Sequence, residues 1–382
     1  MNIFPSRTGI LISILIALVL LCEALYCYTE KRDRFVVVGY FHGDTVQLSR
    51  YPLQKLTHLC YSFLHLKGNR LSINSTKDSL EILYLTSLKK QYPDLKILLS
   101  LGGWGGCKTC SEVFSSGSGR ADFAKSTLEL LQQYGADGID LDWEYPSVEG
   151  FPGHRYTPDD RHNFTLLVQK LRHTLGNNYE ITFAAGATTA CLSESIEWNE
   201  VMPYVDRVHL MTYDLTNGFS KVTGHHTPLY STKDQPESSD HAVRYLDSLG
   251  VPDNKIVLGL AFYARAWSNV DENNNGLYRP GTFVRYIGFK DFGNFFGKDG
   301  AFAYHWDSTA QAPYRYSREE HLYATFDDRR SVALKVDYAL EHHLGGIMFW
   351  ELTEDTSHDG LLDAIDKELK KTKAPIGGKE AR

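Results

Sequence analysis

The sequence predicts an α/β protein built as a closed (β/α)8 TIM barrel, with a small α+β insertion after strand 7. Eight short apolar runs recur along the chain, each ended by Gly or polar residues. Most of these runs are followed by a helix-like segment, which is the alternation of a parallel sheet. A chain of 382 residues with 42% hydrophobic residues can also bury a core of this size.

The eight predicted strands divide evenly between the two halves of the chain. The first four are residues 35–41, 56–64, 96–101 and 138–143, and the second four are residues 180–185, 205–213, 255–262 and 346–350. Because helical crossovers return the chain to the same end of a sheet, we expect all eight strands to be parallel.

Two of the intervening helices are predicted in detail. The first covers about residues 121–134 and ends at Gly135, which leads directly into the fourth strand. The second begins at Thr157-Pro-Asp-Asp160, which resembles a capping box with proline at the first helical position. It stops at Gly176, and its leucines form one helical face: Leu166, Leu167, Leu171 and Leu175.

The spacing changes between the seventh and eighth strands, where the chain is roughly twice as long as the usual unit. Residues 268–316 are rich in Tyr, Phe, Gly and Asn and show no helical period. We therefore expect the insertion at about 268–316, on the seventh βα loop beside any active site. The last barrel helix or two are expected at 317–343.

Both ends of the chain are expected to lie outside the barrel, which we place at 33–370. Arg7 precedes an apolar run from Ile10 to Cys22, which is shorter than the roughly 18 residues of a membrane span. Residues 1–24 are therefore interpreted as a signal peptide, and the protein is expected to be secreted, extracellular or periplasmic. A membrane or lipid anchor is a minor alternative. Residues 371–382 are expected to be a disordered tail.

Charge and cysteine content restrict the partners. The formal net charge is −7 and no long basic stripe is present, so nucleic acid is not an expected partner; we expect a monomer. Cys107 and Cys110 form a Cys-Lys-Thr-Cys pair, for which a loop disulfide is favoured. A redox or zinc role stays open, although the first would usually open a thioredoxin-like helix and the second would need another ligand pair.

Three carboxylates share one face of the fourth strand. Side chains alternate along a strand, so Asp140, Asp142 and Glu144 point one way while Leu141 and Trp143 point the other. In a barrel the first face is the interior, at the C-terminal end where catalytic groups lie. Three like charges cannot all stay ionised in a partly dry site, so at least one should hold a proton near neutral pH. The pattern therefore predicts a general acid.

A solvated acidic edge or a calcium site is the alternative interpretation of this strand. Neither suits a segment whose other face is apolar and which lacks the glycine of a calcium-binding loop. We expect neither a metal nor a cofactor.

Residues 137–146, Asp-Gly-Ile-Asp-Leu-Asp-Trp-Glu-Tyr-Pro, resemble the D-x-x-D-x-D-x-E signature of glycoside hydrolase family 18, the chitinases. Other strands are similar to further motifs of the family: Ser100-Leu-Gly-Gly103, Met211-Thr-Tyr-Asp214, Gly259 to Arg265 and Gly345 to Glu351. The likeness spans about residues 35–362.

The resemblance implies hydrolysis of β-1,4 bonds in chitin or chitooligosaccharides by a substrate-assisted retaining mechanism. Glu144 would protonate the glycosidic oxygen, and the substrate's own acetamide oxygen would attack the anomeric carbon. Asp142 would hold the acetamide N–H, Asp140 would share a proton with Asp142, and Tyr213 would hydrogen-bond the acetamide oxygen.

The resemblance also assigns the surroundings of this centre. The residues expected to bind substrate are Trp350 as the floor, Trp104, Tyr40, Phe63, Met211, Asp214, Tyr263 and Arg265. Those expected to give structural support are Asp137, Ser100, Gly102 and Gly103. Two other functions stay open: an endo-β-N-acetylglucosaminidase acting on N-glycans, and a catalytically weak lectin that binds chitin.

Overall fold

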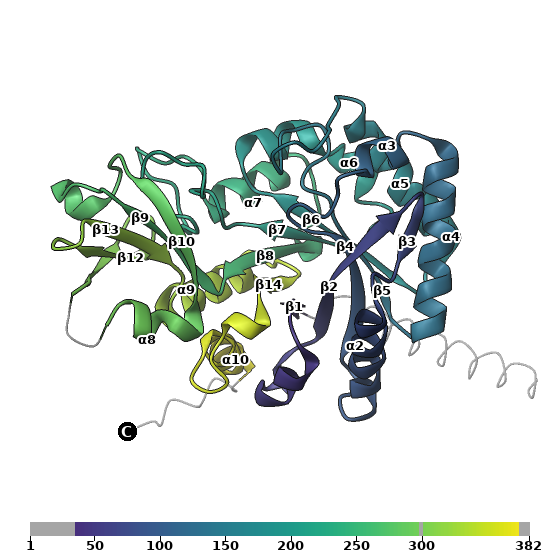
Figure 1. Cartoon of the computed structure of the whole chain (residues 1–382), viewed down its shortest axis with the longest axis horizontal. Helices are drawn as coiled ribbons and strands as arrows, with labels where there is room; N and C mark the ends of the chain where they lie inside the picture. The colour runs from purple at the N-terminus through teal and green to yellow at the C-terminus, as the bar shows by residue number, and fades with distance from the viewer. Residues whose placement is uncertain (1–34, 298–300, 374–382) are drawn as a thin grey trace, which may run out of the picture. The chain divides into compact units, whose positions relative to one another are not determined.

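The eight predicted strands form a closed parallel barrel in a computed structural model that describes residues 35–297 and 301–373 (Figure 1). In chain order they are β1 (Val36–Phe41), β2 (His58–Lys67), β4 (Lys96–Gly102), β5 (Gly138–Asp142), β6 (Glu180–Gly186), β7 (Arg207–Met211), β8 (Ile256–Ala261) and β14 (Gly346–Trp350). The pairing of β1 with both β2 and β14 closes the sheet. The predicted fold class is confirmed.

Helices surround the barrel (Figure 1). They are α2 (Thr76–Ser87), α3 (Cys110–Phe114), α4 (Gly117–Tyr134), α5 (Asp160–Leu175), α6 (Trp198–Val201), α7 (Ser239–Ser248), α9 (Arg329–Glu341) and α10 (Leu361–Lys373). A short strand, β3 (Arg70–Ser72), extends β2 as an antiparallel hairpin. Buried apolar side chains from β1, β7, β8 and β14 meet inside the barrel.

The two helices predicted in detail are both present, with different starts. Helix α4 begins at Gly117 rather than at residue 121, because the Ser116 hydroxyl caps it by accepting from the Gly119 N–H. It ends at Gly135, whose φ of 68° is left-handed. Helix α5 begins at Asp160, and the carboxylate of Asp160 accepts from the Thr157 N–H at 2.8 Å, which is one half of the predicted capping box.

The insertion is a second sheet, which is antiparallel and five-stranded, in the order β10-β9-β13-β12-β11 (Figure 1, green). Its elements are β9 (Tyr263–Ser268), β10 (Thr282–Gly288), α8 (Phe292–Phe295), β11 (Ala303–Asp307), β12 (Ala312–Ser317) and β13 (Leu322–Phe326). The predicted range of 268–316 is therefore too narrow at both ends. The missed strands β9 and β13 are largely buried, so their apolar runs look like those of barrel elements. Residues 317–343 contain the single long helix α9 after β13.

The predicted ends fall mostly outside the described residues. The expected signal peptide, residues 1–24, lies outside them, as do residues 374–382. Helix α10 runs to Lys373, and Lys371 donates to Glu368 at 2.7 Å. The expected start of the disordered tail at residue 371 is therefore too early. From Phe35 to Lys373, excluding 298–300, no helix is long and apolar enough to cross a membrane.

Candidate active site

A cavity of about 1600 Å³ lies at the C-terminal ends of the barrel strands. All eight predicted substrate-binding residues line it: Tyr40, Phe63, Trp104, Met211, Asp214, Tyr263, Arg265 and Trp350. Asp142, Glu144, Tyr213 and Gly102 line it as well. The insertion contributes Phe283 and Tyr286, so the barrel and the second sheet both build the wall.

The three predicted carboxylates lie at different depths. Glu144 is half-buried and lines the cavity, whereas the Asp142 residue is only 4% exposed. Asp140 is 0% exposed and lies inside the barrel, beneath the cavity. The strand β5 thus carries acidic groups from the interior up to the cavity floor.

Asp140 is surrounded by hydrogen-bond donors. Its Oδ2 accepts from the Tyr40 hydroxyl at 3.0 Å and the Ser100 hydroxyl at 2.7 Å. Its Oδ1 accepts from the Thr182 hydroxyl at 2.6 Å and lies 3.3 Å from Nδ1 of His209. Burial alone would raise the pKa of Asp140, but the hydrogen bonds and charge of His209, together with the two hydroxyls, outweigh it and lower the pKa.

Asp142 and Glu144 have the opposite electrostatics. Oδ1 of Asp142 is buried and has no hydrogen-bond partner. Burial, followed by the charges of Glu144 and Asp140, raises the pKa of Asp142 well above its usual range. Burial also raises the pKa of Glu144 to about 7; the charge of Asp214 acts in the same direction, and a hydrogen bond with Tyr145 opposes it. Both shifts favour a proton held by this pair near neutral pH.

Two glycines allow the chain to pass close to this centre. A Cβ on Gly102 would lie 2.3 Å from the carbonyl oxygen of Asp142, and one on Gly103 would lie 2.3 Å from the ring of Phe63. Their φ values of 106° and 76° also disfavour any side chain. Gly102 thus lies against the backbone of Asp142, whereas Gly103 lies against the ring of Phe63 and not against a carboxylate.

Aromatic rings form the floor and one side of the cavity. The Trp350 ring stacks on Phe63 at 5.5 Å between centroids with an interplanar angle of 9°, and it lies 5.9 Å from Tyr40. Trp104 is 49% exposed and contacts the rings of Phe151 and Phe219. Apolar faces of sugar rings pack on such surfaces, while their hydroxyls remain free for hydrogen bonds.

Another part of the cavity wall carries an ion pair between Asp214 and Arg265. Asp214 accepts from the Tyr263 hydroxyl at 2.7 Å and from two nitrogens of Arg265 at 2.5 Å. Burial would raise the pKa of Asp214, but hydrogen bonds from His226 and Arg265 lower it, so this group is ionised. The Tyr213 hydroxyl lies 3.7 Å from the sulfur of Met348. Asp214 follows β7, whereas Tyr263 and Arg265 lie on β9, so the barrel and the second sheet meet at this part of the cavity.

Asp137 and the pair Cys107 and Cys110 do not line the cavity among the described residues. Asp137 precedes β5 at the other end of the barrel, where it pairs with Lys89 at 2.9 Å and accepts from the Ile97 N–H at 2.8 Å. It joins strands rather than supporting the cavity. Cys107 and Cys110 form a disulfide in the loop after β4, with Cα atoms 5.1 Å apart, which agrees with the favoured interpretation.

Several residues around the site were not predicted. Phe151 and Phe219 lie on loops, where no periodic signal marks them. His209 could have been found, because strand alternation places it on the same face as Met211. Together with Cys60 and Asp140, His209 forms a group whose possible metal-ligating atoms lie within 4.8 Å of one another. However, the Asp140 oxygens already face hydrogen donors, which a cation would have to displace.

Known proteins resemble the chain in sequence and fold. The profile of Glycosyl hydrolases family 18 matches residues 36–355. Chitinase A1 of Niallia circulans is 35% identical over 71% of this chain and 42% of its own length. The endochitinase of Manduca sexta is 28% identical over 87% of this chain and 66% of its own length. The chain therefore spans less than two thirds of both relatives.

A solved structure gives the same result for the fold. The family 18 N-acetylglucosaminidase of Paenibacillus barengoltzii superimposes with a TM-score of 0.79 at 36% identity, covering 88% of this chain and 100% of that chain. The profile match, the barrel and the D-x-x-D-x-D-x-E strand point to one conclusion. The chain belongs to family 18 of the glycosyl hydrolases.

Proposed function

We propose that the chain is a chitinase that hydrolyses β-1,4 bonds between N-acetylglucosamine units. The observation that carries this proposal is the pair Asp142 and Glu144, which lines an aromatic cavity with both pKa values raised, while Oδ1 of Asp142 has no partner. The relatives named as chitinases support the choice of substrate.

The proposed reaction needs one acid and one stabilising anion. Glu144, whose pKa is about 7, protonates the glycosidic oxygen, because it is the more exposed of the two carboxyls that line the cavity. The acetamide oxygen of the substrate then attacks the anomeric carbon and forms a cationic oxazolinium ring, while the bond from that carbon to the protonated glycosidic oxygen breaks and the leaving sugar departs as an alcohol. Asp142 accepts the acetamide N–H on its free Oδ1 and stabilises that charge. Glu144 finally removes a proton from the attacking water.

This scheme explains why an N-acetylated sugar suits the site. Trp350 provides an apolar floor, and Tyr213 lines the cavity, where its hydroxyl would exchange the long contact with the Met348 sulfur for a hydrogen bond to the acetamide oxygen. A sugar without the acetamide group would leave Asp142 unpaired and the anomeric carbon without a nucleophile. We therefore expect no cleavage of unsubstituted glucans.

A time course on defined chitin oligomers tests the proposal. We expect shorter N-acetylated products with the β-anomer retained, and Glu144→Gln should reduce kcat at least about 100-fold because the acid is lost. Glu200→Gln makes the same change on the exposed surface of α6 and serves as the control. A wild-type protein that binds these oligomers without cleaving them would be a lectin. One that releases glycans only from glycoproteins would be the N-glycan enzyme. Either result, or inversion of the anomer, would contradict the proposal.

We also propose that the protein is secreted. The apolar run after Arg7 and the disulfide between Cys107 and Cys110 both suit an oxidising compartment. Mass spectrometry of the protein recovered from the culture medium of its source cells should show an N-terminus near residue 25. Retention of the full chain inside the cell would contradict this.

A further inference from the structure

A buried histidine lies directly beneath the proposed catalytic carboxylates. His209 is on β7 and is 1% exposed. Its Nδ1 lies 2.8 Å from the Tyr40 hydroxyl and 3.3 Å from Oδ1 of Asp140, while its Nε2 is buried without a partner. No step of the proposed reaction uses this side chain, although it contacts one of the three acidic groups.

The hydrogen bonds around Asp140 have one consistent direction. The Tyr40 hydroxyl has a single hydrogen, and donating it to Asp140 leaves its oxygen to accept from Nδ1–H of His209. The reverse assignment would place a nitrogen lone pair 3.3 Å from a carboxylate oxygen and would bury an Nε2–H without an acceptor. Nδ1 therefore carries the hydrogen and donates it to the Tyr40 oxygen, while lying 3.3 Å from Oδ1 of Asp140. The hydroxyls of Tyr40, Ser100 and Thr182 donate to Asp140.

The other titratable groups around His209 do not compete for this role. They are Tyr40 from β1, Cys60 from β2 and Asp140 from β5, while its neighbours on β6 and β8 are Ala184 and Val257. Burial, with a contribution from the charge of Asp140, raises the pKa of both Tyr40 and Cys60 well above its usual range, so both groups stay neutral. Arg207, on the same strand, pairs with Glu180 instead.

We propose that His209 is a positioning residue that, through the hydrogen on Nδ1, keeps Asp140 as the permanent anion of the cluster and confines the single proton to Asp142 and Glu144. The inference rests on the proposed function. It differs from the expectation that Asp140 shares a proton with Asp142. A proton on Asp140 would displace a hydrogen bond from Tyr40, Ser100 or Thr182, since both carboxylate oxygens already accept from hydroxyls.

The inference assigns a specific consequence to the loss of the donor. The active cluster holds one proton and two negative charges, and uptake of a second proton removes charge that stabilises the cationic intermediate. Without the Nδ1 hydrogen, Asp140 becomes a better site for that second proton. The acid limb of the pH profile then moves to higher pH, while the alkaline limb, which reports loss of the last proton, stays in place.

The test compares His209→Leu with His209→Asn, whose side-chain N–H can replace the Nδ1 donor. For His209→Leu on a chitin oligomer we expect kcat to fall about tenfold with little change in KM. Its acid limb should move up by about one pH unit. His209→Asn should stay within about threefold of wild type and keep the wild-type acid limb. Thr182→Val removes another donor to Asp140 and should shift the acid limb in the same direction, which keeps the test valid if His209→Leu does not fold.

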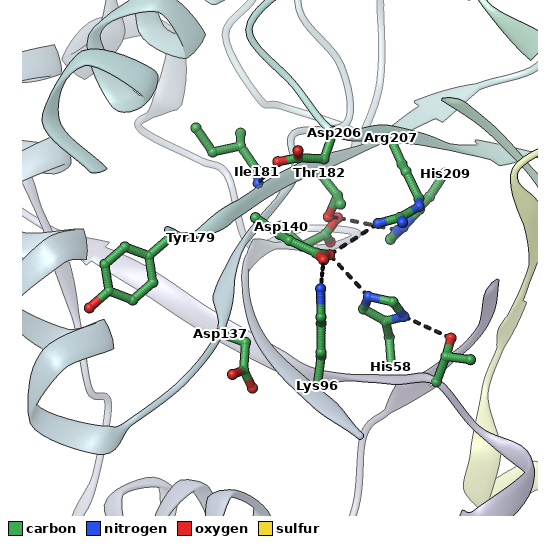
Figure 2. A network of polar contacts seen from close by, with 12 residues as sticks. His58, Lys96, Asp137, Asp140, Tyr179, Ile181, Thr182, Asp206, Arg207 and His209 are labelled. Atoms are coloured by element: carbon green, nitrogen blue, oxygen red, sulfur yellow. Dashed lines mark hydrogen bonds and ion pairs between the residues drawn. The ribbon is translucent and has the colours of Figure 1, made fainter. Parts of the chain in front are cut away.

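The control is a histidine of the same barrel that does not touch Asp140. The side chains of His58, Lys96 and Arg207 point toward one another (Figure 2). All three pair with Glu180 at the N-terminal ends of the strands. His58→Gln is expected to lower the melting temperature and leave the acid limb of kcat unchanged. A role of His209 in packing alone would lower kcat equally at every pH, and that result would overturn the inference.

A second measurement does not require catalysis. A carboxylate with a lowered pKa contributes stability above its unfolded pKa and loses it as the pH falls through the folded pKa. The difference in melting temperature between wild type and His209→Leu should therefore be largest near pH 7 and shrink on acidification. A difference independent of pH would overturn the inference, even if the wild-type protein proved inactive on chitin and the proposed function failed.

Discussion

The two ends of the barrel bury acidic groups in opposite ways. At the N-terminal end, Glu180 accepts from His58 at 3.0 Å and Arg207 at 3.1 Å and also pairs with Lys96, so its pKa is lowered although burial alone would raise it. At the C-terminal end, Asp142 has a free oxygen and a raised pKa. Both carboxylates are largely removed from water, so partners and not depth decide which one holds a proton.

Exchanging carboxylates for amides at both ends gives the largest expected contrast. Asp142→Asn removes the anion that faces the intermediate, so we expect kcat on chitin oligomers to fall about 100-fold. Glu180→Gln changes a group far from the cavity and should leave kcat within about threefold of wild type at a temperature where the variant is folded. Equal losses of kcat in the two variants would remove the functional distinction between the ends.

Stability, unlike kcat, should depend more on the N-terminal carboxylate Glu180 than on Asp142. Glu180→Ala leaves Arg207 and His58 without their shared anion, and we expect the free energy of unfolding in urea to fall by about 3 kcal/mol at pH 7. The pKa of Glu180 is lowered in the folded state, so its contribution is present above the unfolded pKa and lost as the pH falls below it. Unfolding curves at pH 7 and pH 3 should therefore show a smaller difference between variant and wild type at pH 3.

The exposed aromatic side of the cavity provides a third contrast, between binding and chemistry. Trp104 lines the cavity and is 49% exposed, so Trp104→Ala removes a stacking surface and no reacting group. We expect KM for chitin oligomers to rise about tenfold with kcat nearly unchanged. Phe114→Leu alters a buried ring on α3 and is the control. A fall in kcat without a change in KM would show that Trp104 acts on the reaction itself.

The smallest predicted effect is a gain of stability at the C-terminal end of the barrel, where removal of a charge stabilises the fold, in contrast to Glu180 at the N-terminal end. The pKa of Glu144 is raised to about 7, so its effect on stability is favourable below its unfolded pKa and is lost as the pH rises through 7. Glu144→Gln cannot ionise and should be more stable than wild type at pH 8, by about 1 kcal/mol after allowance for solvent screening. Thermal unfolding at pH 5 and pH 8 measures this, and a variant less stable than wild type at pH 8 would contradict the raised pKa.

Sequence patterns predicted the barrel well because each strand carries its own local signal. All eight predicted runs became barrel strands, and Gly135 and Gly176 ended their helices. The insertion was placed correctly but drawn too short, because β9 and β13 look like buried barrel elements. The candidate site was predicted where a motif or strand alternation marked a residue. Phe151 and Phe219 were missed because loops carry no period.

The sequence by itself determined the strands and the common face of Asp140, Asp142 and Glu144, since side-chain alternation is a local property of the chain. Only the tertiary structure decided which of these carboxylates is paired. Asp140 meets Tyr40 across 100 residues of sequence, and Tyr40 meets His209 across 169. Such contacts depend on the register in which the barrel closes, because a shift of one residue would turn the donors away from Asp140. The charge state of each acid therefore follows from closure of the barrel, whereas its position on the strand follows from the chain alone.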